Sequence, residues 1–369
     1  GRAETALRNG GAGATRRNGG NRVKAGAKTD GGGPSYEEVE GHLESLAAKK
    51  VINCEDVRTR RGRRRVYGKL PFAVGMYEFQ VDRLTPGFEA EAQAYMSESF
   101  IESFVREHPR QMRTIPINET ILPDRSVSRY DSIRELIRGA RGPFVLQNCI
   151  CRQGRELSGE DCRQTGMKET CLVLGPAARD TLAEGRGSRM TREETLEFLE
   201  RAEEAGLVLQ GQNTREPVFI CCCCSCCCAI LSRVKHMPNP GELLQSPYAA
   251  VIQPDTCTGC GLCLERCPMG AIRLEKKAAE AGSRGSRAAV GRAAVGGGKA
   301  RVEIERCIGC GLCIGSCPAQ AIALERKEGA GAKDPPGSIM SMYARMFVGR
   351  FGPLKGTLLL LKAGLGFKV

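Results

Sequence analysis

Tryptophan, histidine and long apolar stretches are scarce or absent in this sequence of 369 residues. There is no tryptophan, and the histidines are His42, His108 and His236. The sequence therefore offers few imidazole ligands for a zinc or non-haem iron site. No apolar run reaches about 18 residues, the length that a membrane-spanning helix needs, so we expect no transmembrane helix.

Signals for export and for nucleotide binding are also missing. No apolar segment of a signal peptide opens the chain, which argues against a secreted disulfide scaffold. The glycine-rich stretch before Lys299 continues with Ala300 instead of serine or threonine, and no G-x-G-x-x-G motif opens a helix. Without a motif for nucleotide, flavin or substrate, the sequence gives little support to a self-contained redox enzyme.

Cysteine, glycine and positive charge are abundant. The chain holds 20 cysteines and 46 glycines, and its formal net charge is +13. The cysteines come in tight C-x-x-C groups, which favours reduced, cytoplasmic metal ligation over disulfide bonds. The net positive charge favours binding to acidic partners, nucleic acid or an anionic membrane face, and it does not distinguish among them.

An internal repeat dominates the C-terminal third. Cys257–Glu275 aligns without gaps on Cys307–Glu325 at an offset of 50, with 12 of 19 positions identical. Both copies read C-x-x-C-x-x-C-x-x-x-C-P. Three cysteines at this spacing form a tight loop around one face of a cube-shaped metal cluster, and the fourth ligand must come from elsewhere in the chain. The glycines between them let backbone N–H groups approach the sulfurs.

This repeat resembles the bacterial dicluster ferredoxins, which bind two [4Fe-4S] clusters of low potential. In that family the fourth cysteine of each run crosses to the other cluster. The resemblance therefore implies two ligand sets, with paired zinc sites as the alternative. They are Cys257, Cys260, Cys263 and Cys317 for the first cluster, and Cys307, Cys310, Cys313 and Cys267 for the second.

A second group of cysteines lies in the middle of the chain. It consists of Cys149, Cys151, Cys162 and Cys171 and of the dense run Cys221, Cys222, Cys223, Cys224, Cys226, Cys227 and Cys228. We expect a further metal centre here, iron–sulfur in type, with structural zinc or an unmetallated thiol patch as alternatives. Adjacent cysteines point in different directions, so the seven thiols of the run cannot all face one cubane.

Local patterns around these cysteines predict further structure. The sequence from Asn148 to Arg152 is typical of a buried strand end that turns into a loop, and Arg152, Arg155 and Arg163 are candidates to offset the charge of the centre. A helix is expected after Thr191, which has Glu194 at the capping-box position, and Gly206 should end it.

The N-terminal part begins with a glycine- and arginine-rich tail. From Tyr36 to about Lys50 the apolar spacing predicts a helix, and two short alternating segments, Val51-Ile52 and Val66-Tyr67, then flank the basic run Arg58–Arg65. This order resembles the last helix and the wing of a winged-helix domain. Helical segments are expected over Glu89–Glu107 and Ser132–Arg138.

The sequence as a whole predicts an α+β, multidomain chain, with a winged-helix-like and helical N-terminal part, a Cys-rich middle domain and a C-terminal ferredoxin-like dicluster domain. We expect a disordered tail over 1–34, the winged-helix-like and helical region over 35–142, the Cys-rich metal-binding domain over 143–247, the dicluster domain over 248–328 with a flexible insert over 276–300, and a basic amphipathic tail over 329–369.

The favoured function is single-electron transfer, either as a carrier or as a subunit of an oxidoreductase, with redox proteins as partners and a cytoplasmic location. Residues 339–369 mix Met, Phe and Leu with Arg and Lys, so they are candidates for docking to a partner subunit or to the inner face of the membrane. The first alternative is a redox- or iron-responsive regulator that binds DNA through the basic run. The second is a reductase with its catalytic centre in the Cys-rich domain.

Overall fold

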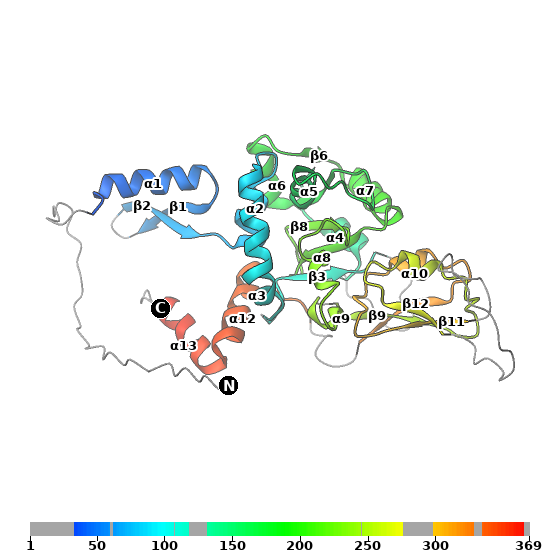
Figure 1. The fold of residues 1–369 in the computed structure, drawn as a ribbon. Helices are drawn as coiled ribbons and strands as arrows, with labels where there is room; N and C mark the ends of the chain where they lie inside the picture. The colour runs from blue at the N-terminus through cyan, green and yellow to red at the C-terminus, as the bar shows by residue number, and fades with distance from the viewer. Residues whose placement is uncertain are drawn as a thin grey trace, which may run out of the picture. The chain divides into compact units, whose positions relative to one another are not determined.

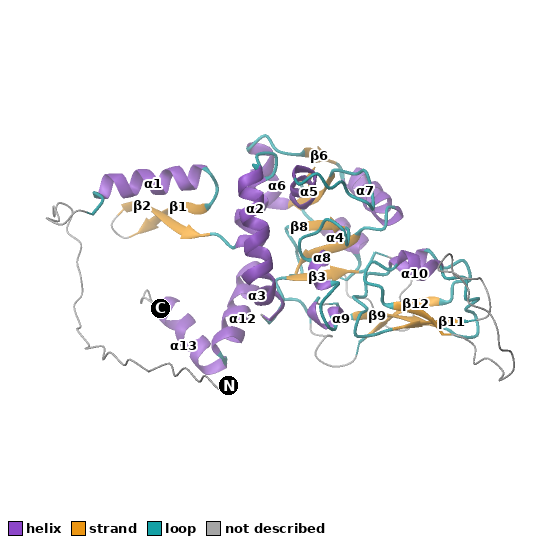
Figure 2. Ribbon diagram, in the orientation of Figure 1, coloured by secondary structure: helices purple, strands orange, loops and turns teal. Residues whose placement is uncertain are grey.

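The computed structural model describes residues 33–59, 62–106, 108–117, 131–244, 246–275, 298–327 and 334–364. Helices and strands are mixed along the chain, which confirms the predicted α+β character (Figures 1 and 2). The chain divides into two compact units, Gly1–Pro71 and Phe72–Val369. Residues 1–32 of the predicted tail and 276–297 of the predicted insert lie outside the described part.

In its described residues the first unit has one helix and one hairpin, in the order that the sequence predicts. Its elements are α1 (Tyr36–Ala48), β1 (Ile52–Thr59) and β2 (Gly62–Lys69). The Ser35 hydroxyl accepts from the Glu38 N–H at 3.2 Å, and the Glu38 carboxylate accepts from the Ser35 N–H at 2.7 Å, so a capping box begins the helix. Any helices that would complete a winged-helix domain before α1 would fall outside the described residues.

The second unit begins with a helical segment that covers one end of the Cys-rich region. It contains the irregular turn η1 (Phe72–Met76), then η2 (Glu78–Gln80), α2 (Pro86–Tyr95), η3 (Met96–Phe100) and α3 (Ile101–Arg106). Thr85 caps α2 by accepting from the Phe88 N–H, and Pro86 occupies the first turn, where its missing N–H costs nothing. The predicted helical segment is thus confirmed from Glu89 to Arg106, and Glu107 lies outside the described residues.

A six-stranded antiparallel sheet forms the centre of the second unit. Its strand order is β3-β7-β8-β5-β4-β6. The strands are β3 (Met112–Ile115), β4 (Phe144–Asn148), β5 (Glu169–Leu174), β6 (Ser188–Met190), β7 (Val208–Gln212) and β8 (Phe219–Cys223).

Helices pack on both faces of this sheet. On one face α4 (Ile133–Gly139) and α7 (Arg192–Glu204) contribute Ile137 and Phe198 to the main core, and on the other α6 (Gly175–Ala183) packs Ala178 against Val145 and Val173. The predicted capping box of Thr191 and Glu194 is present. One expectation is wrong: after β4 the chain turns into the helix α5 (Ile150–Leu157) and not into a loop, and the extended backbone of Cys149 forms its N-cap.

The C-terminal repeat folds as two interlocked halves. After the short helices α8 (Leu231–Val234) and α9 (Pro240–Leu243), the elements are β9 (Tyr248–Ile252), α10 (Leu262–Arg266), β10 (Ile272–Glu275), β11 (Lys299–Val302), α11 (Leu312–Gly315) and β12 (Ile322–Arg326). β9 pairs antiparallel with β12, and β10 pairs antiparallel with β11. Each two-stranded sheet therefore takes one strand from each copy of the repeat.

Two helices close the described chain, α12 (Ile339–Phe351) and α13 (Pro353–Gly364). Ser338 and Ser341 cap α12 reciprocally, and Gly352, with φ 82°, separates the two helices. Gly349 of α12 packs so closely on the His108 carbonyl oxygen that a larger residue would overlap it. Among the described residues, no helix is both long enough and apolar enough to cross a membrane.

Candidate metal centres

The eight cysteines of the repeat line two separate cavities. The first, with about 310 Å³ of atom-free space, is lined by Cys257, Cys260 and Cys263 of the first copy and by Cys317 of the second. The second cavity, of about 360 Å³, is lined by Cys307, Cys310, Cys313 and Cys267. Each cavity therefore contains three sulfurs of one run and the fourth sulfur of the other, which is the grouping that the sequence resemblance implies.

Backbone N–H groups donate to four of these sulfurs, in pairs related by the offset of 50. The pairs are Ala250 with Cys307 at 3.4 Å, Ala300 with Cys257 at 3.5 Å, Ala271 with Cys267 at 3.2 Å and Ala321 with Cys317 at 3.3 Å. The first two bonds cross between the copies, because the strand of one copy donates to the first cysteine of the other. Such bonds stabilise negative charge on a ligating thiolate.

Glycines make the tight cysteine loops possible. Gly261 and Gly311 begin α10 and α11 with φ 81° and 80°, a left-handed conformation that favours glycine. A Cβ at Gly259 would overlap the carbonyl oxygen of Gly298, and one at Gly309 would overlap that of Tyr248. Backbone thus packs directly on backbone around each loop.

The donor set fits an iron–sulfur cluster. Burial raises the pKa of Cys310 to about 12 and that of Cys263 to about 11. Thiols in such surroundings ionise at neutral pH only if a cation compensates the charge, and the iron atoms of a cluster supply that cation. Cysteine is also the ligand that [4Fe-4S] clusters use.

The two cavities differ in their surroundings. Cys260 of the first cavity is exposed, whereas its counterpart Cys310 in the second is half-buried. The second cavity lies against the core of the six-stranded sheet, because its lining residues Met269 and Ile308 belong to that core. The Ile117 N–H, just beyond β3, donates to the Cys310 carbonyl oxygen at 3.1 Å. One cavity is thus near solvent, and the other faces the Cys-rich region.

The eleven cysteines of the Cys-rich region separate into two groups and one single thiol. Cys221 and Cys223 of β8 point to one face of the sheet, and Cys222 points to the other, because side chains alternate along a strand. Cys222 is 1% exposed within the main core. The sequence predicts at least one further metal centre from these cysteines, and the structure does not bring the remaining ten together in one group.

The four-thiol group consists of Cys162, Cys224, Cys226 and Cys227, whose sulfurs all lie within 4.8 Å of one another. The Sγ of Cys162 is 3.6 Å from that of Cys224 and 3.7 Å from that of Cys226. Burial raises the pKa of Cys162, but hydrogen bonds from the Gln164 and Thr165 backbone outweigh it and bring the pKa to about 6.

The six-thiol group consists of Cys149, Cys151, Cys171, Cys221, Cys223 and Cys228. Its side chains form a continuous series of hydrogen-bonded neighbours, in the order Cys149, Cys151, Cys228, Cys223, Cys221 and Cys171. The Cys151 hydrogen bond lowers the pKa of Cys149 to about 7. Gln147 of β4 also donates to the Cys171 Sγ at 3.5 Å.

A small apolar cavity of about 50 Å³ adjoins the six-thiol group. Cys151, Cys221, Cys223 and Cys228 form one wall, and η1, η3 and α3 supply apolar side chains such as Phe100 for the others. Glu78 also lines it, and burial raises the pKa of this carboxyl group to about 8. Glu78 could not be predicted from the sequence, because no local motif links it to the cysteines.

Of the three arginines predicted to offset charge, Arg152 alone lies among the thiols. Its side chain is 6% exposed; burial lowers its pKa, but the Cys149 and Cys224 thiolates raise it above the usual value. Arg155 instead pairs with Glu160 at 2.9 Å, and Arg163 is exposed.

The basic run near the N-terminus lies on the β1–β2 hairpin. Arg58, Arg63 and Arg64 are exposed there, whereas Arg65 pairs with Glu44 at 2.9 Å and Asp56 at 3.4 Å. The hairpin itself is confirmed, and nucleic-acid binding by it stays a prediction.

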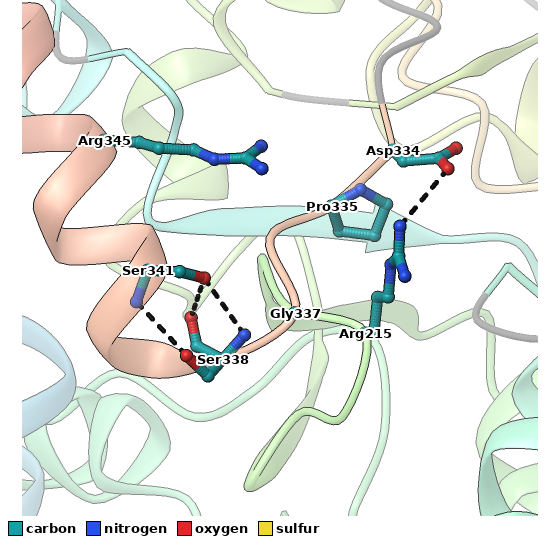
Figure 3. Close-up of a pocket in the computed structure, with 7 residues that line it drawn as sticks. All are labelled: Arg215, Asp334, Pro335, Gly337, Ser338, Ser341 and Arg345. Carbon is teal, nitrogen blue, oxygen red and sulfur yellow. Dashed lines mark hydrogen bonds and ion pairs between the residues drawn. The ribbon is translucent and has the colours of Figure 1, made fainter.

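A further pocket lies beside the start of α12, and no cysteine lines it. Figure 3 shows Arg215 paired with Asp334 at 3.5 Å, the reciprocal bonds of Ser338 and Ser341, and Arg345 on the other side of the pocket. The Arg215 N–H also donates to the Pro336 carbonyl oxygen at 2.9 Å, so these contacts attach α12 to the sheet.

Comparison with known families agrees with the geometry of the C-terminal unit. Residues 256–321 match the family model of the 4Fe-4S dicluster domain. The chain therefore carries a dicluster ferredoxin-like domain within a larger Cys-rich protein, which confirms the resemblance of the repeat. No curated protein and no solved structure matches the chain.

Proposed function

We propose that this chain is an electron-transfer protein, or the electron-transfer subunit of an oxidoreductase, with two [4Fe-4S] clusters in its C-terminal domain. The observation that carries the proposal is the pair of cavities, each lined by three cysteines of one run and the fourth of the other. When bound, such clusters accept and release single electrons. The proposed ligands are the two sets of four cysteines named above.

The surroundings of the cavities support a direction for the relay. Exposed Cys260 marks the side where a redox partner can approach. Met269, Ile308 and Leu312 instead pack into the same core as Cys222, Cys223 and Cys224. We propose that the partner docks at the Cys260 side and that electrons pass through the second cavity toward the Cys-rich region.

Iron and acid-labile sulfide, counted on anaerobically purified protein, test this function. We expect about eight iron and eight sulfide from the domain, and a paramagnetic resonance signal of reduced cubanes after dithionite. Cys260→Ser should lower both counts by about four, because a hydroxyl is a poor ligand for iron–sulfur clusters. Cys54→Ser, in the first unit, is the control. Wild-type protein without a cubane signal would refute the proposal.

The six-thiol group supports a further iron–sulfur centre, which we include in the proposal. Its neighbouring thiols interact in series, four of them line an apolar cavity, and the guanidinium of Arg152 lies beside them. We expect Cys223→Ser to remove iron and sulfide in equal numbers beyond those of the dicluster domain. Cys222→Ser, on the opposite face of the same strand, should remove none. A wild-type count of only eight sulfides would end this part of the proposal.

A reductase is the second candidate function, and the cavity beside the six-thiol group favours it. The half-buried Glu78 carboxyl group lines this cavity together with the thiols, so an acid and several thiols face the same space. A screen of two-electron acceptors with dithionite-reduced protein would test it. Turnover that Cys228→Ser abolishes, with the dicluster signal intact and Cys222→Ser active, would support catalysis there.

A further inference from the structure

We propose that Cys162, Cys224, Cys226 and Cys227 bind a single tetrahedral metal ion, zinc or iron(II), separate from every iron–sulfur cluster of the chain. The four residues come from two places in the sequence. Cys162 lies between α5 and β5, and the other three follow directly after β8.

The distances between the sulfurs select one metal ion. Four thiolates at about 2.3 Å from one ion stand about 3.8 Å apart. The Sγ–Sγ distances are 3.6 Å from Cys162 to Cys224, 3.7 Å from Cys162 to Cys226 and 3.7 Å from Cys226 to Cys227. The ligands of a [4Fe-4S] cluster bind four different iron atoms, so their sulfurs are separated by an additional metal–metal edge. A group in which all four sulfurs lie within 4.8 Å of one another is too compact for that.

The backbone N–H groups of Gln164 and Thr165, two and three residues further on, favour the thiolate form of Cys162. The backbone N–H of Cys227 acts in the same direction on Cys224, although burial outweighs it and raises the pKa of that thiol. Tight turns that direct N–H groups at their own cysteine sulfur stabilise the charge that a bound thiolate keeps.

Arg152 provides a second, independent observation. Its guanidinium is buried, and its Nη1 donates to the Thr170 hydroxyl and to the Cys222 carbonyl oxygen. Among the described residues, the buried Nε and Nη2 atoms of this side chain have no hydrogen-bond partner, and the Cys162 thiolate interacts favourably with its charge. A divalent ion with four thiolates carries a net charge of −2, so a buried cation at its edge is favourable.

The proposed ion has a structural consequence. It would hold the loop around Cys162 against the turn that follows β8, and this turn also carries Cys228 of the six-thiol group. Binding releases the protons of the thiols and forms four metal–sulfur bonds, with no change of oxidation state.

Metal analysis on the full-length, anaerobically purified chain tests the proposal. Wild-type protein should contain one metal ion per chain that no acid-labile sulfide matches, and elemental analysis identifies it as zinc or iron. Cys162→Ser and Cys226→Ser should each lose this ion with the sulfide count unchanged, and Cys222→Ser should keep it. Equal losses of iron and sulfide in Cys162→Ser, or no unmatched ion in the wild type, would overturn the proposal.

A conservative variant separates ligation from folding. Cys226→His keeps a metal ligand at the half-buried position, so it should retain the unmatched ion that Cys226→Ser loses. Exchange of the ion for Co²⁺ should give the intense visible bands of a tetrahedral thiolate complex in the wild type. Identical metal content in the serine and histidine variants would contradict a ligand role for Cys226.

Discussion

The backbone N–H of Ala250 donates to the sulfur of Cys307, 57 residues further along the chain, at 3.4 Å. Its counterpart Ala300 donates to Cys257 at 3.5 Å. The first cysteine of each run is therefore supported by a strand of the other copy, so the stability of each cavity depends on both copies.

Loss of the clusters should loosen the C-terminal domain selectively. Its sheets have only two strands each, and its core consists largely of cysteines and small apolar residues. After anaerobic removal of iron, we expect amide hydrogen exchange in β9 and β12 to rise by at least about tenfold, whereas β7 in the six-stranded sheet stays protected. Unchanged protection of β9 in the iron-free chain would contradict this prediction.

Gly309→Ala should destabilise the domain more than Gly270→Ala. Both glycines have positive φ values, 63° and 61°, but only an added Cβ at Gly309 overlaps backbone, the Tyr248 carbonyl oxygen. Gln320 occupies the position that corresponds to Gly270 in the second copy, with φ 49°, so a side chain is tolerated there. We expect Gly270→Ala to lower the free energy of unfolding by about 1–2 kcal/mol. Gly309→Ala should lower it by a further 1–3 kcal/mol, approximately. Anaerobic denaturant unfolding measures both, and equal losses would be evidence against the overlap.

The buried ion pair of Arg113 and Asp131 joins the sheet to the dicluster domain. The two side chains are 3.1 Å apart and each is 2% exposed, and the Tyr248 hydroxyl of β9 also donates to Asp131 at 3.3 Å. Arg113→Met would leave a buried carboxylate without its cation, so we expect the free energy of unfolding to decrease by about 3–5 kcal/mol. The double variant Arg113→Met/Asp131→Asn should recover much of it. A double variant no more stable than the single one would contradict this explanation.

The pH dependence of Arg113→Met provides a further prediction. Burial raises the pKa of Asp131, and Arg113 opposes that shift. A carboxyl group with a raised pKa in the folded state contributes stability that is full below its ordinary pKa of about 3.9 and is lost as the pH rises through the folded-state value. Without Arg113 that value rises further, so the unfolding midpoint of the variant should decrease as the pH is raised above the ordinary pKa of the carboxyl group, by more than the wild-type midpoint does. Addition of Asp131→Asn should abolish this fall.

The C-terminal helix offers a test of the predicted membrane association. Leu354, Leu358 and Leu361 of α13 are 89%, 53% and 60% exposed and share one face of the helix, beside basic residues such as Lys355. If this face lies on an anionic membrane, the chain should sediment with phosphatidylglycerol vesicles, and Leu358→Glu should reduce the bound fraction at least about tenfold. Leu157→Glu, at another exposed leucine of the same unit, is the control. Equal sedimentation of the two variants would argue against α13 as the contact.

Local signals in the sequence predicted much of this structure. The repeat identified the dicluster domain because three-residue spacing and glycines are local properties, and Thr191 with Glu194 marked the start of α7 for the same reason.

The division of the Cys-rich region could be predicted only in part. Alternation along a strand separates Cys222 from Cys221 and Cys223, and that signal was available from the sequence. Cys162 and Cys224 are 62 residues apart in the sequence, and tertiary packing brings them together. The spacing of the cysteines does not predict this contact. Glu78 begins η2, directly after the irregular turn η1, where helical periodicity gives no guidance.

The pairing of β9 with β12 and of β10 with β11 also has a consequence for biosynthesis. A ribosome that has completed the first run has made only three of the four proposed ligands of the first cluster, and the strand partner of β9 does not yet exist. Iron delivered at that stage would encounter an incomplete set of ligands on a loop whose strand is unpaired. We therefore expect cofactor insertion to follow translation of β12. Both clusters should then be acquired in one step, so that chains with a single cluster are rare.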